Sequence, residues 1–574
     1  MTIALLTAAI ALMGACGSDN GPNASRSIEM QSGDDQTGAV GEELAPLVVR
    51  VLDANDAPEA NVEVTWAVVS GGGSIIPTTV LTDGGGLASA TFTLGPDAGN
   101  QQARASAAEA DGSPVSFHAT AMAGPATQMM KSGGDGQTGI AGSPLAQPYS
   151  AVIRDAFDNP VAGVEVAWAV TSGGGSVSSP TSTSDAAGIA RVTHTLGAAA
   201  GPQTVTATVE GLTGSPLTFS SNASVGIRLV TTVGVTANYG LHDTFVRDGL
   251  AFLCAWNTGI LIYDVGNGFK GGSPSNPQFV SSVVTGGGKV HNAWWYHSPL
   301  GAKKYLFVGE EGPGSIGGTS SGDIHLVDVS NLSSPVEVGS YHLSGAGTHN
   351  FWVDEVNQVL FAAYYNGGVV ALDISGSLPA NLATRELDRI QPGGAGNTYV
   401  WGVMQHQGAV YAMDMVSGFW KLGFSGGSFA IAGGGNNVPE RYGSDLWLHG
   451  SHAYTGTWGF RAAQGNAVKV WQVGAGAPVL VDSVITELIG TVSDVQVTDD
   501  GQLLVFSAEN GANAGLHVYS LADPAHPTYL AKYLVSTGLH TATISVIDGK
   551  TYVFGARNPS SPALMIFDIS SLLP

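Results

Sequence analysis

The sequence predicts an all-β protein built from several domains, and three observations support this prediction. The 574 residues include 81 glycines and only 11% charged residues, whereas charged residues make up about 25% of an average soluble protein. A module of about a hundred residues occurs twice in the N-terminal part, and a shorter unit of about fifty residues recurs in the rest of the chain. A chain of this length also exceeds the size that one hydrophobic core can serve.

The longer repeat is found by comparing the N-terminal part of the chain with itself. Residues 53–58 (DANDAP) match residues 155–160 (DAFDNP), residues 62–68 (VEVTWAV) match 164–170 (VEVAWAV), and residues 70–74 (SGGGS) match 172–176. The size of each copy is typical of an immunoglobulin-type sandwich. In the strand at 62–68, apolar and polar residues alternate, which predicts that Trp66 and its counterpart Trp168 fill the cores between two sheets.

The turn beginning at Asp53 or Asp155, the strand ending in Trp and the glycine-rich loop together resemble bacterial Ig-like domains of the invasin/intimin type. The resemblance implies two sandwiches, at residues 27–123 and 124–224, that act as rigid spacers for a terminal domain.

The shorter unit contains an apolar strand, a second apolar strand after a turn, a third strand that often ends in Asp, and a fourth strand. Four strands per unit are typical of a propeller blade. The residues before the first unit, 227–235, have the character of a fourth strand, and the last unit lacks one. Pairing the two would close a ring and remove an exposed sheet edge. The third strand occurs seven times, at residues 261–265, 324–329, 369–374, 419–422, 468–471, 516–519 and 564–569.

These third strands resemble those of LVIVD-repeat propellers, a family found among exported bacterial proteins. The predicted fold is therefore two tandem Ig-like β-sandwiches followed by a seven-bladed β-propeller at residues 225–574.

Four histidines occupy the start of the first strand in their blades. In propellers this position lies at the central channel, so His242, His291, His349 and His540 are expected to converge at one mouth. Four imidazoles could bind a transition metal or supply a general base. Alternatively, each histidine could tie its blade to the next by hydrogen bonds, as the structural histidine of WD-repeat propellers does. Both interpretations remain open on the sequence alone.

The turns after the second strands should lie on the same face and form a polar and aromatic rim suited to a small or glycan-like ligand. The candidate ligand-binding residues there are Asn257, Glu310, Tyr364, Glu509 and Arg557. Trp256, Glu311, Tyr365, Asn366, Asp414, Trp458 and Asn510 share these turns.

The N-terminus has the layout of an export signal. An apolar run at residues 3–13 is too short to cross a bilayer as a helix. The tetrad ending in Cys16 resembles the lipobox of bacterial lipoproteins, which implies a signal peptide at residues 1–15, acylation of Cys16 and a flexible linker at 16–26. Gly17 after the cysteine favours the outer membrane, by resemblance to lipoprotein sorting. The expected location is therefore the cell envelope, in the outer membrane or at the cell surface, with membrane contact only through the lipid.

The formal net charge of −24 argues against nucleic acid as a partner. Because the sequence contains no complete catalytic constellation, the preferred function is surface binding or adhesion. In that interpretation a monomer presents its propeller to a surface protein, matrix or glycan. The alternative is an exported metal-dependent enzyme, an oxidoreductase or hydrolase, that uses the four histidines. Propellers are used for both kinds of function.

Overall fold

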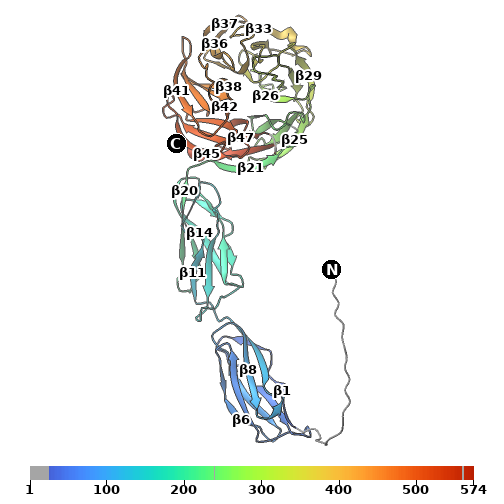
Figure 1. The fold of residues 1–574 in the computed structure, drawn as a ribbon, viewed down its shortest axis with the longest axis vertical. Coiled ribbons are helices and arrows are strands. Elements are labelled where there is room, and N and C mark those ends of the chain that lie inside the picture. The colour runs from blue at the N-terminus through green and yellow to red at the C-terminus, as the bar shows by residue number, and fades with distance from the viewer. Residues whose placement is uncertain (1–24, 238, 559–560, 574) are drawn as a thin grey trace, which may run out of the picture. The chain divides into compact units, whose positions relative to one another are not determined.

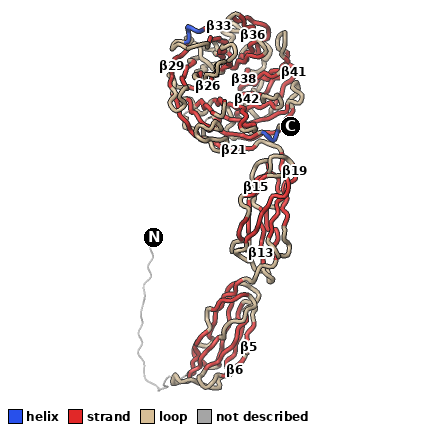
Figure 2. Tube along the Cα trace, turned by 180° about the vertical axis from the view of Figure 1, so that it is seen from behind, coloured by secondary structure: helices blue, strands red, loops and turns tan. Residues whose placement is uncertain are grey.

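The computed structural model describes residues 25–237, 239–558 and 561–573. The predicted signal peptide and Cys16 lie outside these residues. Strands dominate the described chain, and two short 3-10 helices, η1 (Leu382–Arg385) and η2 (Ser570–Leu572), are the helical segments within it (Figure 2). None of the helices described is long and apolar enough to cross a membrane. The predicted fold class, with two Ig-like sandwiches and a seven-bladed propeller, is confirmed.

The first sandwich consists of two five-stranded sheets that enclose Trp66, which is buried against Phe117 with ring centroids 5.6 Å apart. One sheet has the order β5 (Ser74–Ile76), β7 (Leu87–Thr93), β3 (Leu47–Leu52), β1 (Arg26–Ser32), β9 (Ala110–Asp111). The other has the order β2 (Gln36–Ala39), β10 (Val115–Met122), β8 (Gly99–Ala107), β4 (Glu63–Ser70), β6 (Thr79–Leu81).

The second sandwich repeats this design, with Trp168 buried against Phe219 at 5.7 Å. Its sheets have the orders β11 (Gln128–Gly133), β13 (Tyr149–Arg154), β17 (Ile189–Val192); β12 (Gln137–Ile140), β20 (Leu217–Ser224), β19 (Gly201–Thr208), β14 (Glu165–Ser172), β16 (Thr181–Thr183); and β15 (Gly175–Val177), β18 (His194–Leu196). The repeated turn has a clear cause: Asp53 and Asp155 each accept two backbone N–H bonds from the residues that follow them.

Seven four-stranded antiparallel sheets form the propeller in the described residues. Figure 1 shows them arranged as a ring, with the fourth strands, such as β25, β29, β33, β41 and β45, around the outside and β26, β38 and β42 toward the middle. From the innermost strand outward, blades one to three are β22 (Asp243–Arg247), β23 (Leu250–Cys254), β24 (Ile260–Asp264), β25 (Gln278–Val283); β26 (Val290–Tyr296), β27 (Tyr305–Glu310), β28 (Ile324–Asp328), β29 (Val336–Tyr341); and β30 (Phe351–Asp354), β31 (Val359–Ala363), β32 (Val369–Asp373), β33 (Glu386–Ile390).

The remaining blades complete the ring. Blades four to six are β34 (Val400–His406), β35 (Ala409–Asp414), β36 (Gly418–Ser425), β37 (Ser428–Gly434); β38 (Tyr442–His449), β39 (His452–Trp458), β40 (Ala467–Gln472), β41 (Val479–Ile485); and β42 (Thr491–Val497), β43 (Leu503–Glu509), β44 (Gly515–Ser520), β45 (Thr528–Leu534). Blade seven joins β46 (Thr541–Ile547), β47 (Lys550–Arg557) and β48 (Ala563–Asp568) to β21 (Arg228–Gly234), the strand that precedes blade one. This is the ring closure that the sequence predicts.

The aspartates that end several third strands have a structural role. Asp328, Asp373 and Asp568 each accept the backbone N–H of the residue two positions later. They therefore stabilise the turn that follows the third strand.

Candidate functional site

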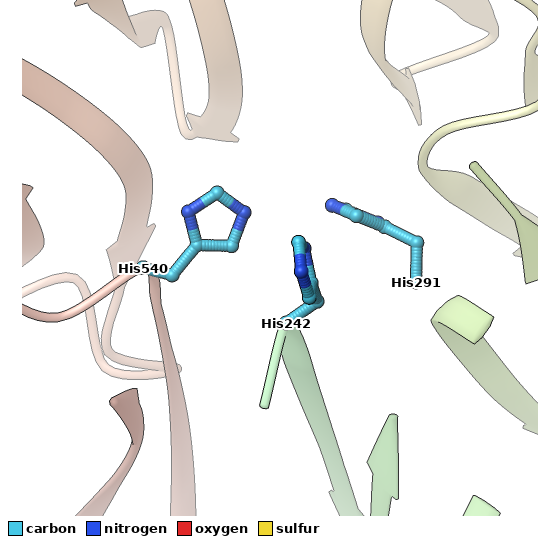
Figure 3. Close-up of side chains that lie close together, drawn as sticks. All are labelled: His242, His291 and His540. Carbon is cyan, nitrogen blue, oxygen red and sulfur yellow. The ribbon is translucent and has the colours of Figure 1, made fainter. Parts of the chain in front are cut away.

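The innermost strands bring the four predicted histidines together. His242 immediately precedes β22, His540 precedes β46, His291 is the second residue of β26, and His349 lies just before β30. Ring centroids are 5.0 Å apart for His242 and His540, 5.5 Å for His242 and His291, and 5.8 Å for His291 and His540. Figure 3 shows these three rings facing a common point. We call these four histidines the histidine cluster.

His349 occupies a different place in the histidine cluster. Its ring lies between His291 and Trp401, with centroid distances of 4.1 and 4.0 Å. The centroid of the Trp401 ring lies 4.7 Å from that of Trp458. The Trp458 ring in turn lies 6.1 Å from the ring of His540. Aromatic rings thus line the side of the cluster away from blade one.

Glu311 is the carboxylate that faces both His291 and His242. Its Oε2 atom lies 3.6 Å from Nε2 of His291 and 3.7 Å from Nδ1 of His242. The hydroxyl of Tyr365 donates a hydrogen bond of 2.5 Å to the other oxygen, Oε1. Glu311 is therefore held by Tyr365 with one oxygen directed at two imidazoles.

A second carboxylate, Glu509, orients His540. Nδ1 of His540 lies 2.6 Å from Oε1 of Glu509, on the neighbouring blade, and the hydroxyl of Ser493 donates to the same oxygen. The Nε2 side of the His540 ring is thus left to face His242 and His291, as Figure 3 shows. His540 fits the structural interpretation of a histidine that links two blades.

His291 does not fit that interpretation. Among the described residues, neither of its ring nitrogens has a hydrogen-bond partner, and the same holds for Nδ1 of His242; all three atoms are buried. Burying such a group without a partner costs about 1–3 kcal/mol. The structure therefore carries polar atoms at the channel mouth that fold stability does not explain.

Burial sets the protonation of the histidine cluster. It lowers the pKa of His242 to about 3, with a further contribution from the charges of His540 and His291. Burial and the charge of His540 likewise hold the pKa of His291 well below its usual range. In His540 burial is outweighed by the charge and hydrogen bond of Glu509, which raise the pKa to about 9. At neutral pH the cluster has neutral imidazoles beside one imidazolium.

Two aromatic residues of the rim have unusual backbones. Trp256 has φ = 44° and Tyr365 has φ = 38°. This left-handed conformation is a genuine outlier for bulky residues, and such strain costs of order 1–3 kcal/mol. It turns Trp256 onto His242, with a centroid distance of 4.2 Å, and Tyr365 toward Glu311. Strain of this kind is concentrated at functional sites.

The rim residues singled out from the sequence are placed as follows. Glu509 contacts the cluster. Glu310 instead pairs with His325 at 3.2 Å inside blade two, and Tyr364 donates to the carbonyl of Gly322. The residues that follow them, Glu311 and Tyr365, lie beside the histidine cluster instead. Asn257 lies in an exposed turn beside Trp256, and Arg557 donates to the carbonyl of Ser561 in its own loop.

Beneath the histidines, the channel continues as a cavity of about 200 Å³. Its lining includes three buried aspartates, Asp243, Asp445 and Asp494, and Asn292 donates a 2.7 Å hydrogen bond to Asp243. Burial and the charge of Asp494 raise the pKa of Asp243 to about 7. Asp243 directly follows His242 in the sequence, but the three aspartates were not among the predicted site residues.

The fold and site define a chain in which Ig-like sandwiches precede a propeller with a polar channel mouth, and two family models agree with this architecture. Residues 136–222 match the model of the bacterial Ig-like domain (group 1), and residues 319–342 match the LVIVD repeat. Among solved structures, the WD40 β-propeller domain of Doa1 is similar, with a TM-score of 0.43 and 11% identity over 60% of this chain and 97% of that chain. No curated protein matches the sequence.

Proposed function

We propose that this chain is a bacterial cell-surface binding protein in which the Ig-like domains carry the propeller and the channel mouth receives the ligand. The domain composition supports a surface or protein-interaction architecture, since group 1 bacterial Ig-like domains are typical of surface proteins. The finer elements of the proposal are the lipid anchor at Cys16, the spacer role of the sandwiches and a protein, matrix or glycan as the partner.

The observation that carries the ligand site is the strained pair Trp256 and Tyr365. A turn that served only to connect two strands would favour glycine at a positive φ. Retaining a Trp and a Tyr there, with the Trp256 ring stacked on His242 and the Tyr365 hydroxyl bonded to Glu311, supports a binding role for the channel mouth. The alternative of an exported metal-dependent enzyme is favoured by a separate observation, the buried and unpaired nitrogens of His291 in the described structure.

Surface display is tested on intact cells that express the full chain. A membrane-impermeant biotin ester should label the propeller lysines on intact cells to the same extent as on lysed cells, and Cys16→Ser should release the protein from the cell. Labelling only after lysis would contradict the proposed location.

The ligand face is tested by Trp256→Gly, which removes the ring and relieves the strained φ. We expect attachment of displaying cells to immobilised matrix proteins or glycans to fall at least tenfold. The melting temperature should change little, because the relieved strain offsets the lost packing. The matched control is Phe269→Gly, which removes an exposed aromatic side chain of blade one. Equal attachment of both variants would exclude the channel mouth as the ligand face.

A further inference from the structure

We propose that the channel mouth binds one divalent transition-metal ion of the Zn²⁺ type through His242, His291 and His540, with Glu311 as the fourth ligand. This inference deepens the proposed function, because it names the first ligand of the same site. It rests on four independent features of the described residues: the spacing of the rings, the position of the carboxylate, the unpaired nitrogens and the groups that orient the ligands.

The spacing of the three rings matches a common ion. Zn–N distances are about 2.0–2.1 Å, which places imidazole centroids about 3.2 Å from a bound ion and about 5 Å from one another in tetrahedral geometry. The observed centroid distances are 5.0, 5.5 and 5.8 Å. One nitrogen from each ring lies within 4.8 Å of the other two. A small contraction of the triangle would therefore complete a three-histidine site.

Glu311 supplies the fourth position. Its Oε2 lies 3.6 and 3.7 Å from the nitrogens of His291 and His242. These separations exceed a hydrogen bond, but they are close to the edge of about 3.4 Å between two ligands of a tetrahedral Zn²⁺ ion. The carboxylate thus approaches each of the two imidazoles at ligand spacing and without a direct bond.

The nitrogens that face the carboxylate need a partner. Nε2 of His291 and Nδ1 of His242 are both buried and lack a hydrogen bond within the described structure. A bound ion would satisfy both atoms. The His242 side chain retains an exposure of 12%, compared with 1% for His291.

Outer groups orient the ligands in the way that metal sites require. Glu509 accepts the bond from Nδ1 of His540, so that Nε2 is directed to the centre of the triangle. Tyr365 fixes the orientation of Glu311. Carboxylate–histidine pairs and hydrogen-bonded carboxylates of this kind are regular outer partners of metal ligands, and their loss typically costs 10–100-fold in affinity.

One competing arrangement exists within the histidine cluster. His349 lies with His291 and Glu311 in a second set whose ligand atoms also approach within 4.8 Å. The stacking of His349 against Trp401 and its position away from His242 and His540 favour the first set. The two sets share His291, but they differ in their requirement for His242 and His349.

The test uses the full chain purified without a histidine tag, stripped with a chelator and titrated with Zn²⁺ by calorimetry and with Co²⁺ by visible absorption. We expect one ion per chain and the strong visible bands of tetrahedral Co²⁺. His291→Gln and His242→Gln should each weaken binding at least 100-fold, and Tyr365→Phe about 10-fold. The matched control is His526→Gln, an exposed histidine that pairs with Asp482.

Each result has a defined meaning. The absence of stoichiometric binding, or equal binding by His242→Gln and the control, overturns the proposal. Loss of binding in His349→Gln with full binding in His242→Gln overturns this ligand set in favour of the other. If His291→Gln has a lowered melting temperature in the metal-free state, its loss of binding could reflect unfolding. The comparison of His242→Gln, at a more exposed position, with the control then tests the proposal. Surface labelling of intact cells does not depend on the ion, so a failure of this inference is distinguishable from a failure of the proposed location.

Discussion

The Nδ1 atom of His325 lies 2.6 Å from a carboxylate oxygen of Glu337, inside the second blade. Burial opposes a charge on His325, but the hydrogen bonds and charges of Glu310 and Glu337 outweigh it and raise its pKa above the usual value. The folded protein therefore holds a proton that the unfolded chain releases near pH 6.5. The resulting stabilisation is complete below that pH and is lost as the pH rises through the raised pKa of the folded state.

His325→Gln should therefore destabilise the propeller by roughly 2–4 kcal/mol at pH 6, because it leaves Glu310 buried without its cation. The difference in the free energy of unfolding between His325→Gln and the unmodified protein should be smaller at pH 9. Urea unfolding followed by tryptophan fluorescence measures this, since nine of the eleven tryptophans lie in residues 225–574. His342→Gln, which removes an exposed histidine paired with Asp323, is the control. An equal loss at both pH values would contradict the assigned charge.

The sequence predicted the architecture well because repeats carry it. Seven third strands and an isolated strand at residues 227–235 were enough to predict the ring and its closure. The histidine cluster followed from the alignment of blades, since each histidine begins an innermost strand. A repeat shows which positions are equivalent, and in a propeller the equivalent positions at the start of the innermost strands meet around the central channel.

The choice between Glu310 and Glu311, or Tyr364 and Tyr365, could not be made in this way. Successive side chains of a strand point to opposite faces, but the pairing of β26 with β27 shifts by one residue between Val290 and Asn292. The left-handed backbone of Tyr365 redirects its ring again. Bulges and positive φ values of large residues arise from tertiary packing, so alternation in the sequence does not reveal them.

Asp445 and Asp494, two of the buried aspartates beneath the histidine cluster, provide a second prediction about the dependence of stability on pH. Burial, together with the charge of Asp445, raises the pKa of Asp494 far above its usual value. The folded state thus binds a proton that the unfolded chain loses above pH 4, so stability falls as the pH rises. Asp494→Asn imitates the protonated acid and can still accept the backbone N–H of Ala542. At pH 8 we expect Asp494→Asn to unfold at a higher urea concentration than the unmodified protein, with a free energy of unfolding larger by roughly 1 kcal/mol.

The control for Asp494 is Asp499→Asn, which removes the same charge from an exposed position in the same blade. It should change the free energy of unfolding little, because the side chain is exposed. Unfolding of Asp494→Asn at lower urea than this control at pH 8 would show that the pair is ionised and stabilising, contrary to the prediction.

An ion pair joins the two ends of the propeller sequence where the ring closes. Nη2 of Arg228 on β21 lies 2.7 Å from Asp568 on β48, and both side chains are largely buried. Arg228→Met keeps the packing of the side chain but leaves the Asp568 carboxylate without its cation, at a cost of roughly 1–3 kcal/mol. Thermal unfolding should show a lower melting temperature, whereas Arg389→Met, at an exposed pair with Glu386, should change it little. Equal melting of the two variants would mean that strand pairing alone closes the ring.

The accessibility of the Cys254 thiol measures how readily blade one, which holds His242, opens. The thiol is fully buried in β23, and its carbonyl accepts the backbone N–H of His242 at 3.0 Å. Burial raises the pKa of the thiol well above its usual value, and the thiolate is the reactive form. In a Cys16→Ser protein, where Cys254 is the remaining thiol of the sequence, Ellman's reagent should give almost no colour at pH 8 in the folded state and one thiol per chain in urea. Labelling of the folded protein at a rate close to that in urea would show that blade one opens readily, and the histidine cluster with it. Slow labelling would confirm that His242 lies on a rigid support.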